Sequence, residues 1–523
     1  MKSFAVNRIS AVACHATSRK EGEFKWREGA VPLGKPMSVF EVEEFRKYGH
    51  RMVDFIADYY RDIAEYPVRS QVQPGYLECQ LPTAAPEDPE SLDDVLADVQ
   101  SKIIPGVTHW QSPSFFAFYP ANFSTAGFLG DMLSGGLNVI GFSWISSPAA
   151  TELEQIVLDW LGKLLQLPEE FLFSGGGGGV IQGTASEAVC VAMLAARKRA
   201  VAKLMAEGAS ETEAFGRLTG YVSDQTHVSV QKAAQIAGVA ANLRVLPTNS
   251  STNFSLSPAA LRKAVAEDAA NGFLPFFLCG TVGTTSSAAV DPLPELGDIA
   301  LEYGMWFHVD AAFAGNACIC PEVRHNLDGI EKVDSYSMNP HKWLLTNFDC
   351  STLWLKDPRQ LVAAMSTSPE YLRNKATDEK LVVDYKDWQL PLGRKFRSLK
   401  LWFTMRLYGA SGLRKHIREH IRIAEHLESL VRTSDRFEMV APRNFSLVCF
   451  RLKPLENDTD NGRTVNATLL EAINSRGACF LTHTVLDGVF TLRMAIGSSR
   501  TELQHVMEAW TIINTEADRL MKH

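Results

Sequence analysis

A lysine in an apolar setting is the first residue of this sequence whose surroundings suggest covalent chemistry. Lys342 lies between His341 and Trp343 and is followed by two leucines, so we expect its ammonium group to be partly desolvated. Desolvation lowers the pKa of an amine and favours its use as a nucleophile. Asp310 ends an apolar run that begins at Met305, which places an acid at the end of an expected strand.

A nucleophilic lysine and a buried acid are the two groups that pyridoxal phosphate requires. The lysine forms a Schiff base with the aldehyde, and the acid keeps the pyridine nitrogen protonated so that the ring accepts the electrons of a carbanion. Taken singly, Asp310 and Lys342 also fit a core strand that ends in Asp and a surface lysine before an apolar run. The pair alone therefore leaves both interpretations open.

A run of five glycines, Gly175 to Gly179, precedes Thr184, Ser186 and a helical pattern through Arg199. Glycines allow close approach of backbone amides to a ligand, and a helix N-terminus favours an anion, so the stretch predicts a phosphate site. A flexible linker is the alternative. The spacing matches neither GxGxxG nor a Walker loop, so a nucleotide site finds no support.

Two aromatic stretches could line a pocket or fill the core. Residues 108–120 are dense in aromatic side chains and interrupted by prolines, and residues 143–148 contain Trp144 ahead of a helix from about Ala149. Composition alone favours the core.

Two polar stretches follow Lys342. Residues 366–380, which contain Tyr371, have few apolar anchors and are expected to form a surface loop. The basic cluster at residues 394–397 could be a solvated face or a partner for a phosphate.

The sequence pattern of the chain that must position these residues predicts an α/β fold. Apolar strands are expected near residues 220, 243, 276 and 306, separated by helical patterns, which predicts a mainly parallel sheet with helices on both sides. Strand-like segments at residues 446–452 and 489–495 indicate a small C-terminal α/β domain.

Near the N-terminus, Ser38 and Glu41 have capping-box spacing before an apolar stripe that runs from Phe45 to Tyr60. This N-terminal helical segment needs a surface to cover it. Its own domain and a second subunit are both possible.

Composition excludes some classes of protein. A formal charge of -8 over 523 residues argues against broad binding of nucleic acid, and no apolar run approaches the length of a membrane span. The first 20 residues lack acidic side chains, as in a transit peptide, although a disordered tail is the favoured interpretation.

Three strings together resemble one family. HVDAA at residues 308–312, NPHKW at residues 339–343 and SDQTH at residues 223–227 are similar to the group II pyridoxal-phosphate decarboxylases, and specifically to the plant aromatic L-amino acid decarboxylases. The resemblance spans roughly residues 38–515. It implies the aspartate aminotransferase-like fold (fold type I), pyridoxal 5'-phosphate as cofactor, no metal, a homodimer and a cytoplasmic location.

The resemblance also implies residue roles. Lys342 would carry the cofactor, Asp310 would hold the pyridine nitrogen, His227 would stack on the ring and assist proton transfer, and Tyr371 would reprotonate the substrate carbon. Further cofactor contacts would be Ala185, Ser186, Thr281, Asn339 and His341. Substrate contacts would be Trp110, Phe118, Tyr119, Pro120, Trp144 and Gly393.

The expected reaction is decarboxylation of an aromatic amino acid to the aryl-ethylamine. In the resembled family a tyrosine at the position of Tyr371 accompanies amine formation, whereas phenylalanine accompanies an aromatic acetaldehyde synthase. Gly393 favours tryptophan or phenylalanine as substrate, with tyrosine or dopa possible. Phe313, where relatives commonly have tyrosine, and Pro391-Leu392 leave the substrate open. A catalytically inactive dimeric homologue is the non-enzymatic alternative.

These expectations divide the chain into four parts. Residues 1–37 form a tail, residues 38–124 an N-terminal helical dimerisation segment, residues 125–399 the large cofactor-binding domain, and residues 400–523 the small C-terminal domain.

Overall fold

A seven-stranded sheet forms the centre of the molecule. The structure is a computed structural model that describes residues 37–367, 369–379, 381–454 and 458–521. The strand order is β1-β7-β6-β5-β4-β2-β3, in which β2 to β6 run parallel and β7 pairs antiparallel with both β6 and β1. The strands are β1 Gly178–Gln182, β2 Leu218–Ser223, β3 Leu243–Leu246, β4 Leu274–Thr281, β5 Trp306–Asp310, β6 Ser335–Met338 and β7 Ser351–Leu355. The prediction of a mainly parallel sheet is confirmed.

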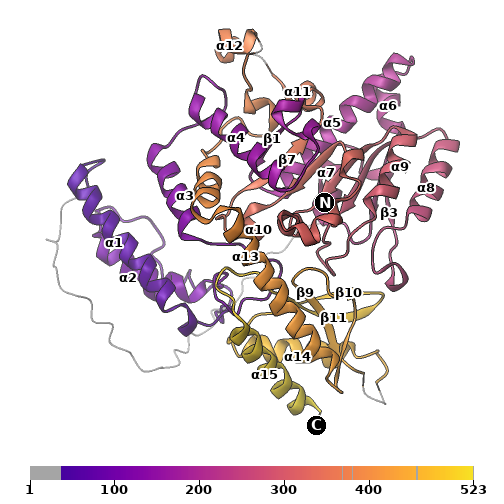
Figure 1. Cartoon of the computed structure of the whole chain (residues 1–523). Coiled ribbons are helices and arrows are strands. Elements are labelled where there is room, and N and C mark those ends of the chain that lie inside the picture. The colour runs from indigo at the N-terminus through magenta and orange to yellow at the C-terminus, as the bar shows by residue number, and fades with distance from the viewer. Residues whose placement is uncertain (1–36, 368, 380, 455–457, 522–523) are drawn as a thin grey trace, which may run out of the picture.

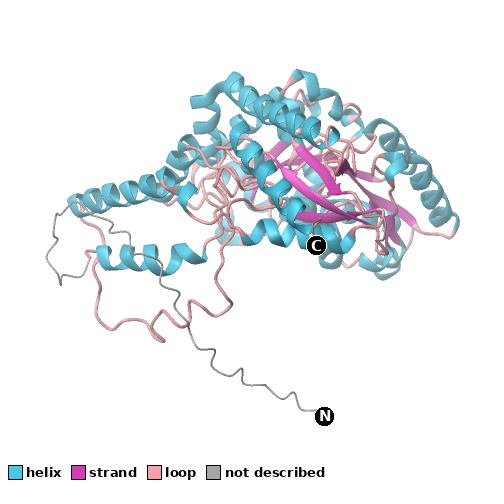
Figure 2. Ribbon diagram, turned by 90° about the horizontal axis from the view of Figure 1, so that it is seen from below, coloured by secondary structure: helices cyan, strands magenta, loops and turns pink. Residues whose placement is uncertain are grey.

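Helices cover both faces of this sheet, as Figure 2 shows. One apolar core contains residues of α5 and α7, and a second contains residues of α4, α8 and α9, so each face is sealed separately. The helices of this region are α3 Thr125–Leu137, α4 Pro148–Leu164, α5 Ala185–Ala206, α6 Glu211–Arg217, α7 Val228–Ile236, α8 Pro258–Ala270, α9 Leu293–Tyr303, α10 Pro340–Trp343, α11 Pro358–Met365 and α12 Lys375–Asp378.

A smaller antiparallel sheet follows, with the order β10-β11-β9-β8. Helix α13, Ser398–Arg432, runs from the large sheet to this region and bends at Gly409, where φ is 63° (Figure 1). The remaining elements are β8 Phe437–Met439, β9 Leu447–Leu452, α14 Arg463–Ser475, β10 Thr482–Leu486, β11 Val489–Ala495 and α15 Leu503–Leu520. The predicted C-terminal α/β unit is present, while the exact division at residues 399 and 400 stays a prediction.

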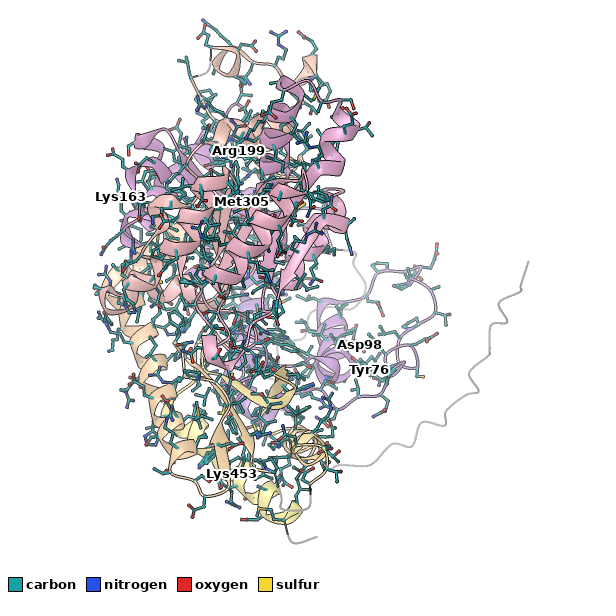
Figure 3. All side chains as sticks on the ribbon, turned by 90° about the vertical axis from the view of Figure 1, so that its right-hand side faces the viewer. Tyr76, Asp98, Lys163, Arg199, Met305 and Lys453 are labelled. Atoms are coloured by element: carbon teal, nitrogen blue, oxygen red, sulfur yellow. The ribbon has the colours of Figure 1, made fainter. Side chains whose placement is uncertain are left out.

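The N-terminal helices α1, Val42–Arg61, and α2, Leu92–Asp98, project from the body. Figure 3 shows Tyr76 and Asp98 on this projection. The predicted capping box at Ser38 is wrong: the helix begins at Val42, and the Glu41 carboxylate caps it by accepting from the N–H of Glu44 at 2.7 Å. Phe45 and Met52 of the apolar stripe are exposed, so this part of the stripe still lacks a covering surface.

The five glycines do not form the N-terminus of a helix. Gly178 and Gly179 lie in β1, and a Cβ on Gly177 would lie 2.0 Å from the carbonyl oxygen of Glu170. Helix α5 begins at the other end of β1, where Thr184 is the N-cap residue. The glycine run therefore does not lie at the helix N-terminus that the phosphate prediction requires, and close packing against backbone atoms explains Gly175 and Gly177.

Among the described residues, no helix combines the length and the apolar character needed to cross a bilayer.

We predict that Gly177→Ala lowers the free energy of unfolding by about 1–3 kcal/mol, because the added methyl group overlaps backbone atoms. Gly216→Ala is the control, since Gly216 lies in α6 with nothing within 4 Å of an added Cβ. The control should be neutral or stabilising, because alanine favours a helix interior. Thermal unfolding of both variants measures the difference, and equal melting temperatures would contradict the packing explanation.

Candidate active site

The site lies at the carboxyl ends of the parallel strands β4 and β5. Thr281 ends β4 and is in register with Asp310, which ends β5, and β6 leads through Asn339 into α10, the short helix that carries Lys342. Ligands of α/β sheets bind at such strand ends. A small cavity opens there, lined by Tyr119, Ala185, His227, Thr281, Gly283, Thr285, Asp310, Ala312, Phe313 and Lys342.

The Lys342 amine is prepared for nucleophilic use. Burial lowers the pKa of Lys342, Asp310 opposes this shift, and the positive charge of Arg493 adds to it. The amine lies 5.6 Å from the centre of the Tyr119 ring. A lower pKa leaves a larger fraction of the amine uncharged at neutral pH, as attack on an aldehyde requires.

Asp310 is held in a fixed orientation at the end of β5. Its side chain is buried, and Oδ1 accepts a hydrogen bond of 3.0 Å from the N–H of Ala312. The carboxylate faces a cavity that also contains the Lys342 amine. It is the acid that can hold a proton on a ring nitrogen.

His227 presents a neutral imidazole to the cavity. Its Nδ1 accepts from the N–H of Ser229 at 3.2 Å, which leaves Nε2 as the nitrogen that carries the hydrogen. Burial lowers the pKa of His227, and the nearby Asp310 opposes the shift. The neutral ring is suited to stacking on an aromatic cofactor.

Thr281 supplies a test of whether a ligand fits. Its N–H donates to Asp291 at 2.7 Å, but its buried Oγ1 has no hydrogen-bond partner within the described part of the chain. A buried hydroxyl without a partner is costly, so one that lines a cavity indicates a polar group of a ligand. A cofactor with a polar ring substituent fits this position.

The N-terminus of α5 supplies the anion site that the glycine run does not. This helix has 22 residues, and its first turn contains Ala185, which lines the cavity, and Ser186. Free N–H groups and the positive end of the helix dipole favour a phosphate here. The predicted contacts Ala185 and Ser186 thus lie where a phosphate fits.

Tyr119 and Phe313 form an aromatic wall beside Lys342. Their rings are stacked with centres 3.9 Å apart, and the Tyr119 hydroxyl donates to the carbonyl of Thr284 at 2.8 Å. Phe313 stacks in turn on Trp343, with ring centres 4.6 Å apart. The wall is therefore fixed from both sides.

Three other predicted substrate residues from the same stretch do not line this cavity. Phe118 and Trp110 are partly exposed and stack on each other, with ring centres 5.6 Å apart. Pro120 packs against the backbone of Gly497.

Trp144 and Gly393 also lie outside the cavity. The Trp144 ring donates to Glu152 at 2.8 Å, and its backbone N–H donates to Asp384 at 2.9 Å. Gly393 is exposed in the single chain, where an added Cβ would lie 3.8 Å from Ile140.

Asn339, the N-cap residue of α10, and His341, within α10, are buried without lining the cavity. Asn339 Oδ1 accepts from Ser351 at 2.7 Å, and His341 Nδ1 accepts from the N–H of Cys350 at 2.9 Å. Burial lowers the pKa of His341 to about 3, so the ring is neutral at physiological pH. Both residues support the turn that carries Lys342.

Tyr371 is 80% exposed and lies apart from the cavity of its own chain. It belongs to a short turn, Glu370–Leu372, just before α12, which Figure 1 places at the top of the molecule and away from α10. The predicted surface loop is present. Tyr371 can reach a cavity only after a movement of this loop or in a second copy of the chain.

Arg493 is a site residue that sequence reasoning missed. It is buried in β11, donates to the carbonyl oxygens of Ser286 and Phe118 at 3.1 and 3.3 Å, and lies 5.3 Å from the Tyr119 ring. The sequence signal that could have identified Arg493 is that it is a single charged residue inside the apolar strand at residues 489–495.

The two arginines of the basic cluster after Gly393 form ion pairs. Arg394 pairs with Glu154, and Arg397 pairs with Asp349. Neither proposed role, a solvated face or a phosphate partner, describes Arg394, because this side chain and Glu154 are both buried.

The cavity combines a desolvated lysine, a buried acid and a neutral histidine at the strand ends, beside a free helix N-terminus. These groups define a pyridoxal-phosphate enzyme. Residues 74–453 match the model of the pyridoxal-dependent decarboxylase conserved domain, so the chain belongs to this family. Its cofactor is pyridoxal phosphate.

Relatives with known names support the assignment. Tryptophan decarboxylase 2 of Oryza sativa subsp. japonica is 58% identical over 92% of this chain and 96% of its own length. Phenylacetaldehyde synthase of Arabidopsis thaliana is also 58% identical, over 93% and 99%. The crystal structure of Catharanthus roseus tryptophan decarboxylase in complex with L-tryptophan is 53% identical, covers 92% of this chain and 100% of that chain, and has a TM-score of 0.88.

We predict that Thr281→Val raises the stability of the cofactor-free protein by about 1 kcal/mol, because it removes a buried hydroxyl that has no partner. The same change should weaken cofactor binding, since valine has no hydroxyl that can form a hydrogen bond with the ligand. Melting temperatures with and without pyridoxal phosphate measure both effects.

Thr219→Val is the matched control. Thr219 lies in β2 outside the cavity, and its buried Oγ1 likewise has no partner among the described residues. This variant should stabilise both forms equally. An unchanged stabilisation by cofactor in Thr281→Val would contradict the role of Thr281.

Proposed function

We propose that this chain decarboxylates aromatic L-amino acids to the aryl-ethylamine and carbon dioxide. The observation that carries the proposal is the Lys342, Asp310 and His227 set beside the aromatic wall of Tyr119 and Phe313. The names of the relatives, which include tryptophan and tyrosine decarboxylases, support an aromatic substrate.

Several residues at the cavity have a part in this reaction. When bound, pyridoxal phosphate would supply a ring that can take up the electron pair of the breaking bond. Lys342 would provide the amine that holds the cofactor, Asp310 would keep a proton on the ring nitrogen, and His227 would pack against the ring as a neutral imidazole. Ala185 and Ser186, at the N-terminus of α5, would receive the phosphate.

Arg493 gives the cavity a fixed positive charge. Arg493 lies 5.3 Å from the ring centre of Tyr119, which lines the cavity, and its positive charge helps to lower the pKa of Lys342. We infer that this charge attracts the carboxylate of the incoming substrate. The low dielectric of the buried site strengthens the attraction.

The wall of Tyr119 and Phe313 is suited to an aromatic side chain, because stacked rings offer a flat apolar surface. Gly393 supports tryptophan, since a missing side chain leaves space for a larger ring. The family resemblance extends this preference to phenylalanine over tyrosine. Tyrosine and dopa remain possible substrates. Trp110, Phe118, Pro120 and Trp144 are kept as proposed substrate contacts in the assembled enzyme.

We also propose that the chain is a cytoplasmic homodimer. Exposed apolar side chains gather on α1, on α3 and on the segments near Gly393, namely Val42, Phe45, Met52, Val53, Leu129, Met132, Leu133, Leu137, Ile140, Ile145, Phe348, Leu390 and Leu392. Such an exposed apolar surface favours a protein interface. The exposure of this surface supports the proposed dimerisation role of residues 38–124.

An aromatic acetaldehyde synthase is the alternative that a relative favours, since the Arabidopsis thaliana protein is a phenylacetaldehyde synthase. That reaction consumes oxygen and water and releases an aldehyde, carbon dioxide, ammonia and hydrogen peroxide. We propose that Tyr371 decides between the two outcomes by giving its hydroxyl proton to the substrate carbon. The presence of tyrosine favours the amine.

We predict that the wild-type enzyme converts tryptophan or phenylalanine to the amine without peroxide, and that Tyr371→Phe produces aldehyde and peroxide instead. Phenylalanine keeps the ring but has no proton to give. Amine, aldehyde and peroxide are quantified for tryptophan, phenylalanine, tyrosine and dopa separately. Tyr303→Phe, at the end of α9, is the control and should leave the products unchanged. Aldehyde and peroxide from the wild type would replace the proposal by its alternative.

We predict that Tyr371 serves the cavity of the partner subunit, because it is exposed and distant from its own Lys342. Neither Lys342→Ala nor Tyr371→Phe homodimers should form amine. Mixed dimers of the two variants should regain it, since one cavity then combines an intact Lys342 with an intact Tyr371 from the other subunit. No recovery of amine in mixed dimers would mean that the loop closes over its own chain.

A further inference from the structure

One buried side chain holds the segment that carries Gly393. Gln389 is buried, and its Nε2 amide group donates to the carbonyl oxygens of Pro391, Leu392 and Gly393 at 2.5, 3.4 and 3.5 Å. Three successive carbonyls thus converge on one amide group. The path of the backbone through Gly393 is set by the position of Gln389.

Gln389 is fixed in turn by a buried ion pair. Its Oε1 accepts from Arg394 Nη1 at 2.9 Å, while Arg394 Nη2 donates to Glu154 Oε2 at 2.6 Å. Arg394 and Glu154 are both buried. A buried pair of this kind contributes specific geometry, since either charge alone would be strongly unfavourable.

Glu154 connects this segment to the strand that precedes the phosphate turn. Its Oε1 accepts from the N–H of Ile181 in β1 at 2.7 Å. The next residue, Gln182, donates to the carbonyl of Trp388 at 2.7 Å, and the turn to Ala185 follows directly. The same network therefore touches the segment at residues 388–394 and the strand that leads to the cofactor.

Burial of its own apolar side chains does not hold this segment. Leu390 and Leu392 are about half exposed, at 46% and 47%, and Gly393 is exposed next to Ile140. The outward side of the segment thus belongs to the exposed apolar surface, while its inward side is held by polar contacts. The hydrogen bonds of Gln389 and Arg394 hold the segment in position, because apolar packing does not.

We propose that Gln389, Arg394 and Glu154 are positioning residues for substrate selection. They hold the backbone of Gly393 at a fixed distance from the phosphate turn, so they set the space available to the aromatic side chain. The proposal rests on the proposed function and extends it from Gly393 to the buried residues behind it. None of the three touches the reacting atoms.

Gln389→Met tests the proposal, because methionine keeps the length of the side chain and removes both its donor and its acceptor. We expect the KM for the best aromatic substrate to rise about fivefold, with a smaller change in kcat, because a misplaced pocket wall weakens discrimination among rings. The preference for the best substrate over the second, as a ratio of kcat/KM values, should fall by a similar factor. Calorimetric titration with the two corresponding amines should show the same loss of preference in Kd.

Asn466→Leu is the matched control. Asn466 is a buried amide that holds backbone groups of Leu452 and Gly462 in the small domain, away from Gly393. Its loss reduces the amount of folded enzyme, which lowers the activity on both substrates equally and leaves their ratio unchanged.

Arg394→Lys is a second test that does not depend on the folding of Gln389→Met. Lysine keeps a charge beside Glu154 but cannot hold both Glu154 and Gln389 through a planar fork. It should lower the same ratio. Wild-type activity with unchanged ratios in both variants would overturn this inference alone. A wild-type enzyme that neither converts aromatic amino acids nor binds their amines would overturn the proposed function and this inference with it.

Discussion

The desolvated amine of Lys342 beside Asp310 is the constraint on which the rest of the structure depends. An amine is a nucleophile only when it loses its proton, and burial lowers its pKa for this purpose. The same burial would make an unpaired charge costly, so an opposite charge has to stand nearby. Asp310 does so at the end of a central strand, where its backbone is hydrogen-bonded on both sides.

The parallel sheet explains how residues distant in the sequence reach one cavity. Thr281 and Asp310 end neighbouring strands, and α10 begins after a third. The carboxyl ends of parallel strands meet at one edge, so each strand delivers one side chain without a long loop. The aromatic pair of Tyr119 and Phe313 closes this edge, and Trp343, the residue after Lys342, stacks behind it. The wall and the nucleophile therefore share one rigid support.

Sequence reasoning predicted the sheet and the residues of the cavity, because both follow from local patterns. Apolar runs marked β2, β4 and β5, and short strings marked His227, Asp310 and Lys342. The glycine run misled because composition cannot distinguish a backbone that approaches a ligand from one that approaches its own carbonyls, as at Gly177. Arg493 and the pairing of Arg394 with Glu154 were missed because they depend on contacts between residues far apart in the chain.

The chain thus combines a closely packed interior with surface residues that are exposed in a single copy of the chain. The residues proposed for cofactor chemistry, Lys342, Asp310 and His227, lie in the interior at one cavity, where hydrogen bonds hold Asp310 and His227. In the proposed function, substrate choice and product outcome depend on Gly393 and Tyr371, which are both exposed. Changes at exposed positions cost little stability. Relatives with the same fold can therefore differ in substrate and in product while the cofactor site stays intact, as the presence of both decarboxylases and an acetaldehyde synthase among them indicates.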